Sequence, residues 1–86
     1  MADILIVEDT DIQRQHAESQ LDGHNLTFAT TAEEVPEMEQ FDFVLTGMFL
    51  PESKGDQPNY EAGLRIFEQA CQLEKESRYP RVNPWH

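Results

Sequence analysis

The sequence is poor in basic residues, in cysteine and in long apolar runs. Its 6 Lys and Arg stand against 17 Asp and Glu, for a formal net charge of −11. Nucleic acids and anionic lipid headgroups are bound by clustered Lys and Arg, so both kinds of partner are excluded. The single cysteine, Cys71, allows no internal disulfide. With no apolar run near the roughly 18 residues of a membrane span and no basic leader, we expect a cytoplasmic protein.

The length and the apolar content predict one small domain. The chain has 86 residues, of which Leu, Ile, Val and Phe make up 20. Such a composition supports a modest core, and it lies just above the level at which disorder is expected. The excess of acid increases solubility, and it leaves basic proteins and divalent cations open as partners.

The first half of the chain alternates between strand and helix patterns. Residues 4–7 are four consecutive aliphatics, which is typical of a strand covered on both faces in a parallel sheet. Thr10 or Asp11 then caps a helix that runs to about Leu21. Its apolar face, which includes Ile12, is weak. Residues 26–31 are β-prone and predict a second strand.

The second half continues the alternation. Residues 32–40 predict a short or distorted helix, because Pro36 breaks a backbone hydrogen bond. Residues 41–46 predict a third strand, and Asn59 is a candidate cap for an amphipathic helix over 60–75. The tail, 76–86, contains no full element: a strand that starts at Arg81 is stopped by Pro84.

Three segments carry a resemblance to a known family: residues 4–9 (ILIVED), residues 41–51 (FDFVLTGMFLP) and Gly63-Leu64. Their order and separation resemble the receiver domain of two-component response regulators, a signal-transduction module. The resemblance covers residues 2–75 and implies a partial flavodoxin-like α/β fold, with a three-stranded parallel sheet in the order 2-1-3 and flanking helices. Residues 1–75 would form a receiver-like domain that lacks strands four and five, and residues 76–86 a C-terminal tail.

The resemblance fails at the residue on which the family's chemistry depends. The family places its phosphoacceptor aspartate four residues before the proline, and that position is Gly47 here. Glycine has no side chain to phosphorylate, so position 47 is a degenerate phosphoacceptor. Thr46 is expected to face the opposite side of the sheet, because neighbouring side chains in a strand alternate. Asp42 is expected to lie at the far end of the same strand, so neither residue is a good substitute acceptor. Neither Lys54 nor Lys75 matches the lysine that contacts the phosphoryl group in the family.

Glu8 and Asp9 match the family's Mg²⁺-binding acids, and two carboxylates can hold a hard cation weakly. No cofactor is required, and any Mg²⁺ site is expected to be weak without a third carboxylate at position 47. The competing interpretation is structural: acids at this strand end favour the N-terminus of the next helix through its dipole.

The absence of a fourth strand predicts an exposed sheet edge along strand three, formed by Phe41, Phe43, Val44 and Leu45. An apolar open edge favours pairing with another strand. We therefore expect either a homodimer through this edge or strand addition by another protein, unless the tail folds over it.

The sequence thus favours a non-enzymatic pseudo-receiver: a regulatory protein-interaction module that takes no phosphoryl group. One alternative is a Mg²⁺-responsive signalling domain of the two-component type that acts through Glu8 and Asp9. The other is a truncated fragment with no independent function.

Overall fold

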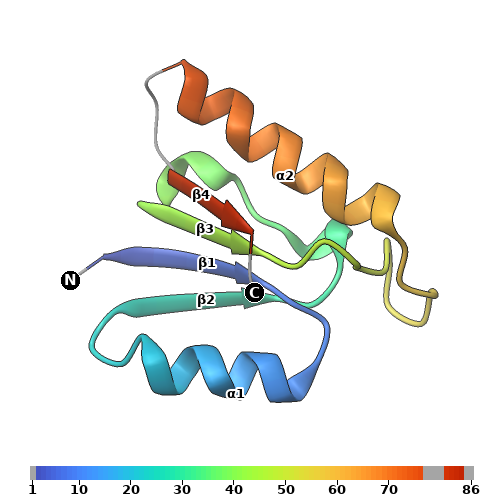
Figure 1. Cartoon of the computed structure of the whole chain (residues 1–86), viewed down its shortest axis with the longest axis horizontal. Coiled ribbons are helices and arrows are strands. Elements are labelled where there is room, and N and C mark those ends of the chain that lie inside the picture. Colours follow the sequence, from blue (N-terminus) through green and yellow to red (C-terminus); the bar gives the residue numbers. More distant parts are fainter. Residues whose placement is uncertain (1, 77–80, 85–86) are drawn as a thin grey trace.

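A computed structural model describes residues 2–76 and 81–84, and it shows an α/β fold built on one parallel sheet (Figure 1). The strand order is β2-β1-β3-β4, so the predicted α/β class and the predicted 2-1-3 order are confirmed. The elements are β1 (Asp3–Val7), α1 (Asp11–Gln20), β2 (Asn25–Ala29), the short 3₁₀ helices η1 (Ala32–Glu34) and η2 (Met38–Gln40), β3 (Phe43–Thr46), α2 (Tyr60–Lys75) and β4 (Arg81–Pro84).

The aliphatic residues of β1 form the centre of the core, because successive side chains in a strand point to opposite faces. Leu5 and Val7 are buried with residues of α2 on one face of the sheet. Ile4 and Ile6 are buried with Ala17 of α1 on the other face. The four-residue apolar run therefore belongs to a strand that is covered on both sides, as predicted.

Side-chain caps begin both helices at the expected residues. The Thr10 hydroxyl accepts a hydrogen bond from the Gln13 N–H (3.4 Å), and Asn59 Oδ1 accepts one from the Ala62 N–H (2.9 Å). These bonds satisfy N–H groups that have no partner within the helix. The apolar face expected for α1 is weaker still in the structure, because Ile12 is 77% exposed.

The segment between β2 and β3 forms no α-helix. It consists of η1 and η2, separated by Val35, Pro36 and Glu37. Val35 and Glu37 on either side of the proline are extended, with ψ near 120°. A proline disfavours helical backbone in the residue before it and removes a helical N–H, so the segment bends instead of continuing as a helix.

The prediction that strand four is lacking is wrong. Residues Arg81 to Pro84 form β4, which pairs in parallel with β3 from Phe43↔Arg81 to Thr46↔Pro84. Proline is tolerated here because β4 is the terminal strand of the described sheet and Pro84 is its last residue.

The open edge expected on β3 is therefore wrong as well. Of its four residues, Phe41 and Val44 lie in the core with exposures of 6% and 0%, Leu45 is half-buried, and only Phe43 is exposed, at 38%. Because β4 supplies the hydrogen-bonding neighbour of β3, the basis for a homodimer through this edge is removed.

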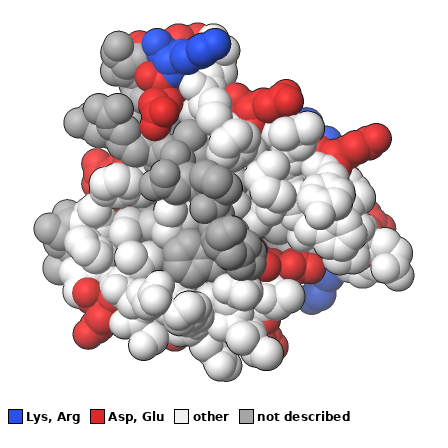
Figure 2. Space-filling model, in the orientation of Figure 1, with Lys and Arg blue, Asp and Glu red and all other residues white. Residues whose placement is uncertain are grey.

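On the face of the molecule shown in Figure 2, acidic side chains lie around the periphery and basic ones are few. Of the helices in the described part of the chain, none combines the length and the apolar content that crossing a bilayer requires.

Candidate functional site at the carboxyl end of the sheet

The residues that follow β1 and β3 are brought together at the carboxyl end of the sheet. The register pairs Val7 with Thr46, and the ladder continues with a bond from the Gly47 N–H to the Val7 carbonyl (2.8 Å). On the other side, the Glu8 N–H donates to the carbonyl of Ala29, the last residue of β2 (3.0 Å). Glu8 thus lies between the ends of β2 and β3. Open α/β sheets bind ligands at this end of their strands.

The Glu8 side chain fills the space in front of Gly47. Glu8 is only 4% exposed, and a Cβ at Gly47 would stand 2.8 Å from Glu8 Oε2. Real Cβ atoms essentially never approach another heavy atom so closely. Position 47, which the sequence analysis predicts to be a degenerate phosphoacceptor, therefore has no carboxylate of its own. The carboxylate of Glu8, the residue after β1, lies against it.

The Glu8 carboxylate is also held by the backbone that leads into α1. Its Oε1 accepts hydrogen bonds from the N–H groups of Asp9 (3.1 Å) and Thr10 (3.4 Å). Thr10 is the N-cap of α1, so a negative charge is placed where the helix dipole stabilises it. This geometry supports the structural interpretation of the acidic pair.

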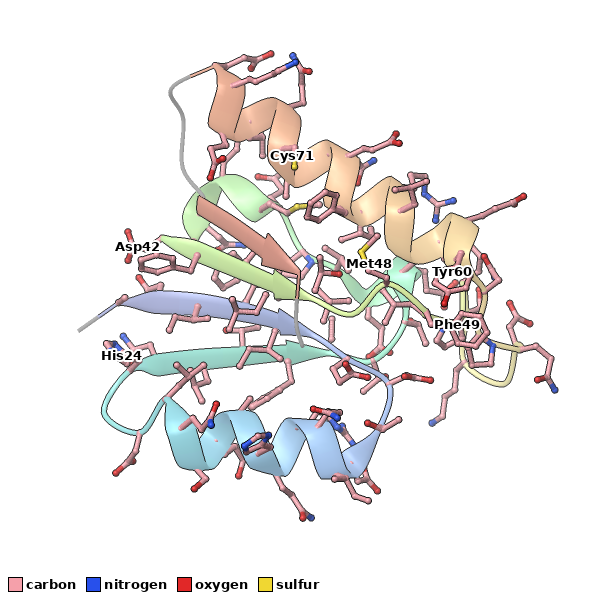
Figure 3. All side chains as sticks on the ribbon, in the orientation of Figure 1. His24, Asp42, Met48, Phe49, Tyr60 and Cys71 are labelled. Atoms are coloured by element: carbon pink, nitrogen blue, oxygen red, sulfur yellow. The ribbon has the colours of Figure 1, made fainter. Side chains whose placement is uncertain are left out.

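The other side chains considered as acceptors are engaged elsewhere. Thr46 is fully buried, and its hydroxyl donates to the Gly47 carbonyl (3.0 Å). Asp42 precedes β3 and lies at the opposite end of the sheet from Phe49 and Tyr60 (Figure 3). There, Asp42 Oδ2 accepts a hydrogen bond from the Asp3 N–H (2.9 Å), which anchors the start of β1.

Glu8 and Asp9 are the two acids considered as ligands for a metal at this end of the sheet. Among the described residues, no group of three or more His, Cys, Asp or Glu side chains is placed to hold an ion. Glu8 is buried, and the half-exposed Asp9 follows it directly. Weak binding of Mg²⁺ by these two residues belongs to the alternative of a Mg²⁺-responsive domain and stays untested.

The loop from Met48 to Asn59 forms one wall of this end of the sheet. Leu50 and Asn59 exchange two backbone hydrogen bonds, of 3.1 and 2.9 Å, which close the loop. The loop is tied to η1 by a bond from the Ala32 N–H to the Pro51 carbonyl (2.9 Å). It is tied to α2 by Arg65, which donates to Glu52 (2.6 Å).

Gly63 allows α2 to lie directly on this loop. A Cβ at Gly63 would collide with the carbonyl of Met48 and stand 2.8 Å from its Cα. The obstacle is backbone, which moves less easily than the end of a side chain. The Gly63 position noted in the sequence therefore has a packing reason here, since it seats α2 beside the chain that leaves β3.

Two exposed aromatic side chains at the same end were not singled out from the sequence. Phe49 and Tyr60 are 50% and 68% exposed, and their rings meet edge to face with centroids 4.9 Å apart (Figure 3). They come from the start of the loop and the start of α2, so the sequence separation of eleven positions hides their contact.

Two carboxylates near this end are stabilised in their charged form. Hydrogen bonds from the hydroxyls of Thr30 and Thr31 lower the pKa of Glu34 below its usual value. The hydrogen bond from Arg65 lowers the pKa of Glu52. The first effect is local to η1, which begins directly after Thr31, and the second ties the loop to α2.

Comparison with known proteins identified no match: no family model, no curated protein and no solved structure matches this chain. The receiver resemblance therefore rests on the chain's own residues.

Proposed function

We propose that this chain is a receiver-like interaction module that acts by binding another protein and takes no phosphoryl group. It is not an enzyme in this proposal, and it works in the cytoplasm as a regulatory pseudo-receiver. The partner is a protein, because the strongly acidic composition disfavours nucleic acid and anionic membranes.

The observation that carries the proposal is the packing of Glu8 against Gly47. Phosphoryl transfer to a receiver requires a carboxylate at the end of β3, and this chain has only backbone there. The buried Glu8 Oε2 lies where a side chain at position 47 would begin. Two further features agree with it: the 2-1-3 order of β1 to β3 and the acidic pair directly after β1.

The test is incubation with acetyl phosphate and Mg²⁺, followed by intact mass spectrometry and a backbone amide NMR spectrum. We expect an unchanged mass and unchanged amide shifts for Asp9, Gly47 and Met48. A receiver domain that carries aspartate at the matching position serves as a positive control for the reagent. A phosphoryl adduct on this chain, or Mg²⁺-dependent shifts centred on Glu8 and Asp9, would contradict the proposal and favour the Mg²⁺-responsive alternative.

A further inference from the structure

The strand β2 has a neighbour on one side only, because it is a terminal strand of the described sheet and pairs with β1 alone (Figure 1). The Asn25 N–H donates to the Ala2 carbonyl (2.9 Å), and the Ala29 carbonyl accepts a bond from the residue after β1 (3.0 Å). Backbone groups of alternate residues in a strand point to opposite sides. The N–H and carbonyl groups of Leu26 and Phe28 therefore point away from β1, toward the outer edge of the sheet.

This outer edge of β2 lacks the features that usually protect a strand edge. Natural sheets block such edges with charged side chains, proline or bulges. The five residues of β2 include no charged residue and no proline, and they pair with β1 without a bulge. The other terminal strand of the described sheet, β4, contains Arg81 and Pro84. The two edges therefore differ, and the β2 edge is the one left open to pairing.

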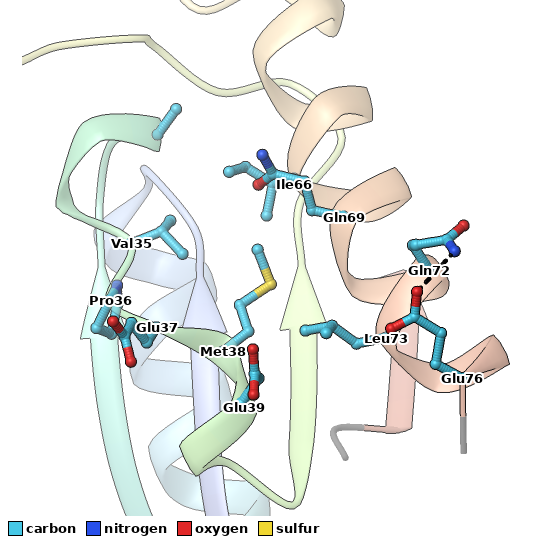
Figure 4. A pocket seen from close by; sticks show the side chains of 11 residues that line it. Val35, Pro36, Glu37, Met38, Glu39, Ile66, Gln69, Gln72, Leu73 and Glu76 are labelled. Carbon is cyan, nitrogen blue, oxygen red and sulfur yellow. Dashed lines mark hydrogen bonds between the residues drawn. The ribbon is translucent and has the colours of Figure 1, made fainter. Parts of the chain in front are cut away.

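Of two hollows in the described surface, only one lies at a strand edge. The larger, of about 650 Å³, lies between α2 and the segment that contains η1 and η2, so an element borders it on each side (Figure 4). The smaller, of about 280 Å³, lies between α1 and Phe28 of β2. Phe28 is left half-buried, so α1 covers the apolar face of β2 incompletely.

The sequence of β2 is complementary to itself in an antiparallel arrangement. With a two-fold axis at Thr27, Leu26 of one copy lies opposite Phe28 of the other, and these residues exchange their outward backbone bonds. Leu26 and Phe28 share the face on which they pack against Ile4 and Ile6. Thr27 is exposed on the other face, where it meets Thr27 of the second copy. Apolar pairs and Thr–Thr pairs directly opposite each other stabilise neighbouring strands.

The β2 edge is also the place where two copies of an acidic chain meet with little repulsion. From Gly23 to Ala32 the sequence contains no Lys, Arg, Asp or Glu, and this is the longest such stretch in the chain. A charged segment of another protein finds no opposite charge on β2, whereas a second copy brings an equally uncharged strand. The rest of each copy still repels the other, because the net charge is −11.

We propose that two copies of this chain pair through β2, in antiparallel orientation about a two-fold axis at Thr27, so that their sheets join into one. Each pair of Leu26 and Phe28 exchanges both of its N–H···O bonds across the axis. The same surface is used on both copies, so association stops at the dimer. β4 lies at the opposite edge of the sheet and takes no part. This inference goes beyond the proposed function and does not depend on it.

Sedimentation velocity of the full chain from about 1 μM to about 1 mM tests the pairing. We expect a monomer–dimer equilibrium with a dissociation constant on the order of 100 μM, as for a small interface. Added NaCl should strengthen it, because salt screens the repulsion between the acidic copies. Amide hydrogen exchange of Leu26 and Phe28 should slow at the higher concentration, because their outward N–H groups gain acceptors in the dimer.

Substitutions of Thr27 test the position of the axis, because this side chain is exposed and lies outside the core. Thr27→Lys places two ammonium groups opposite each other and should weaken the dimer by about fivefold or more. It also lowers the negative charge of each copy, so general repulsion predicts the opposite change. Thr27→Val keeps a β-branched residue and should leave the dissociation constant within about twofold. Leu64→Lys adds the same charge at an exposed position of α2 and should not weaken the dimer.

Disulfide trapping tests the register, with two matched cysteine variants in a Cys71→Ala background. In the proposed pairing the two Thr27 residues form a non-hydrogen-bonded pair with Cα atoms about 4.5 Å apart, a separation that a disulfide can span. The two Asn25 residues lie about 14 Å apart, because they are four positions out of register. With oxidised glutathione as the oxidant, Thr27→Cys should therefore form a covalent dimer and Asn25→Cys should not. Circular dichroism checks that each variant is folded.

Three results would overturn the inference: a chain that stays monomeric at the highest concentration, a Thr27→Lys variant that dimerises as well as the unaltered chain, or equal trapping of the two cysteine variants. Slowed exchange confined to α2 or β4 would assign the contact to another surface and overturn it too. None of these measurements uses a phosphoryl donor. A monomeric chain without a phosphoryl adduct leaves the proposed function standing, whereas an adduct on a dimeric chain rejects that function alone.

Discussion

At the scale of single residues, Glu8 and Gly47 depend on each other. Glu8 occupies the space in front of Gly47. Its Oε1 also accepts hydrogen bonds from the N–H groups of Asp9 and Thr10, just before α1. A buried carboxylate is costly unless hydrogen bonds compensate for its lost hydration. Gly47 has no side chain that would clash with the Glu8 carboxylate, and the N–H groups before α1 supply its hydrogen-bond donors. The position of Glu8 therefore depends on the glycine.

This dependence predicts a coupling between two substitutions. Gly47→Ala should destabilise the fold by about 1 kcal/mol, because the new methyl group displaces a flexible carboxylate. Glu8→Ala removes both the obstacle and an acceptor of two N–H groups. A double-mutant cycle measured by urea unfolding tests this coupling. The double variant should lose less free energy of unfolding than the two single variants together, by about 0.5 kcal/mol or more. Strict additivity would show that the two side chains do not compete for space.

A second residue-scale prediction concerns Glu34, whose pKa is lowered by the hydroxyls of Thr30 (2.7 Å) and Thr31 (3.0 Å). A depressed pKa in the folded state contributes stability above the unfolded glutamate pKa, and that contribution is lost as the pH falls through the folded value. A carbon-detected NMR titration of the Glu34 carboxyl should give a midpoint below that of a glutamate in an unfolded peptide. Thr30→Val should raise this midpoint, and an unchanged midpoint would contradict the assignment.

At the scale of elements, α2 is the element most closely fitted to its surroundings. One side of the helix packs against the rest of the molecule: it carries the buried residues Ala62, Ile66 and Ala70. The contact between Gly63 and the Met48 backbone lies on this side as well. The opposite side carries Leu64 and Tyr60, which are exposed. The fit at Gly63 places the loop that carries Phe49, so the arrangement at the carboxyl end depends on it.

Replacing Gly63 by alanine tests this fit through the sign of the effect. In an ordinary helix interior, glycine to alanine stabilises by about 1 kcal/mol. Here the methyl group meets the Met48 backbone, so Gly63→Ala should destabilise by about 2 kcal/mol or more in urea unfolding. Glu68→Ala, at an exposed position on the same helix, is the control and should change stability by less than about 0.5 kcal/mol. A stabilised Gly63→Ala protein would mean that α2 does not contact Met48.

At the scale of the whole molecule, the acidic excess opposes compaction. The net charge is −11, and the ion pairs Arg14–Asp11 and Arg65–Glu52 lie on the surface. Exposed pairs of this kind contribute little to stability. The excess of negative charge therefore repels itself more strongly in the folded chain than in the expanded one.

Raising NaCl from low to physiological concentration should accordingly raise Tm by a few degrees at pH 7, because salt screens the repulsion. A variant with Glu18→Gln and Glu68→Gln, both exposed, should show a smaller salt effect and a higher Tm at low salt. Thermal unfolding followed by circular dichroism measures both. A Tm that falls with added salt would show that attractive surface pairs outweigh the repulsion.

Local signals in the sequence were sufficient for most elements. The aliphatic run of β1, the cap at Asn59 and the span of α2 agree with the structure because hydrophobic periodicity and caps act over a few neighbouring residues. The pair Glu8 and Gly47 was also located from sequence, since both residues directly follow strands that lie side by side.

The sequence by itself determined the α/β class and the lack of a side chain at position 47, because these follow from short-range patterns. The 2-1-3 order was expected only from the resemblance to receiver domains. Only the tertiary structure decided three other features: the pairing of β4 with β3, the replacement of a crossover helix by η1 and η2, and the groove beside α2. Strand pairing and the filling of space depend on contacts between residues far apart in the chain. A segment such as Arg81 to Pro84 has too weak a local preference to reveal that a partner strand will hold it.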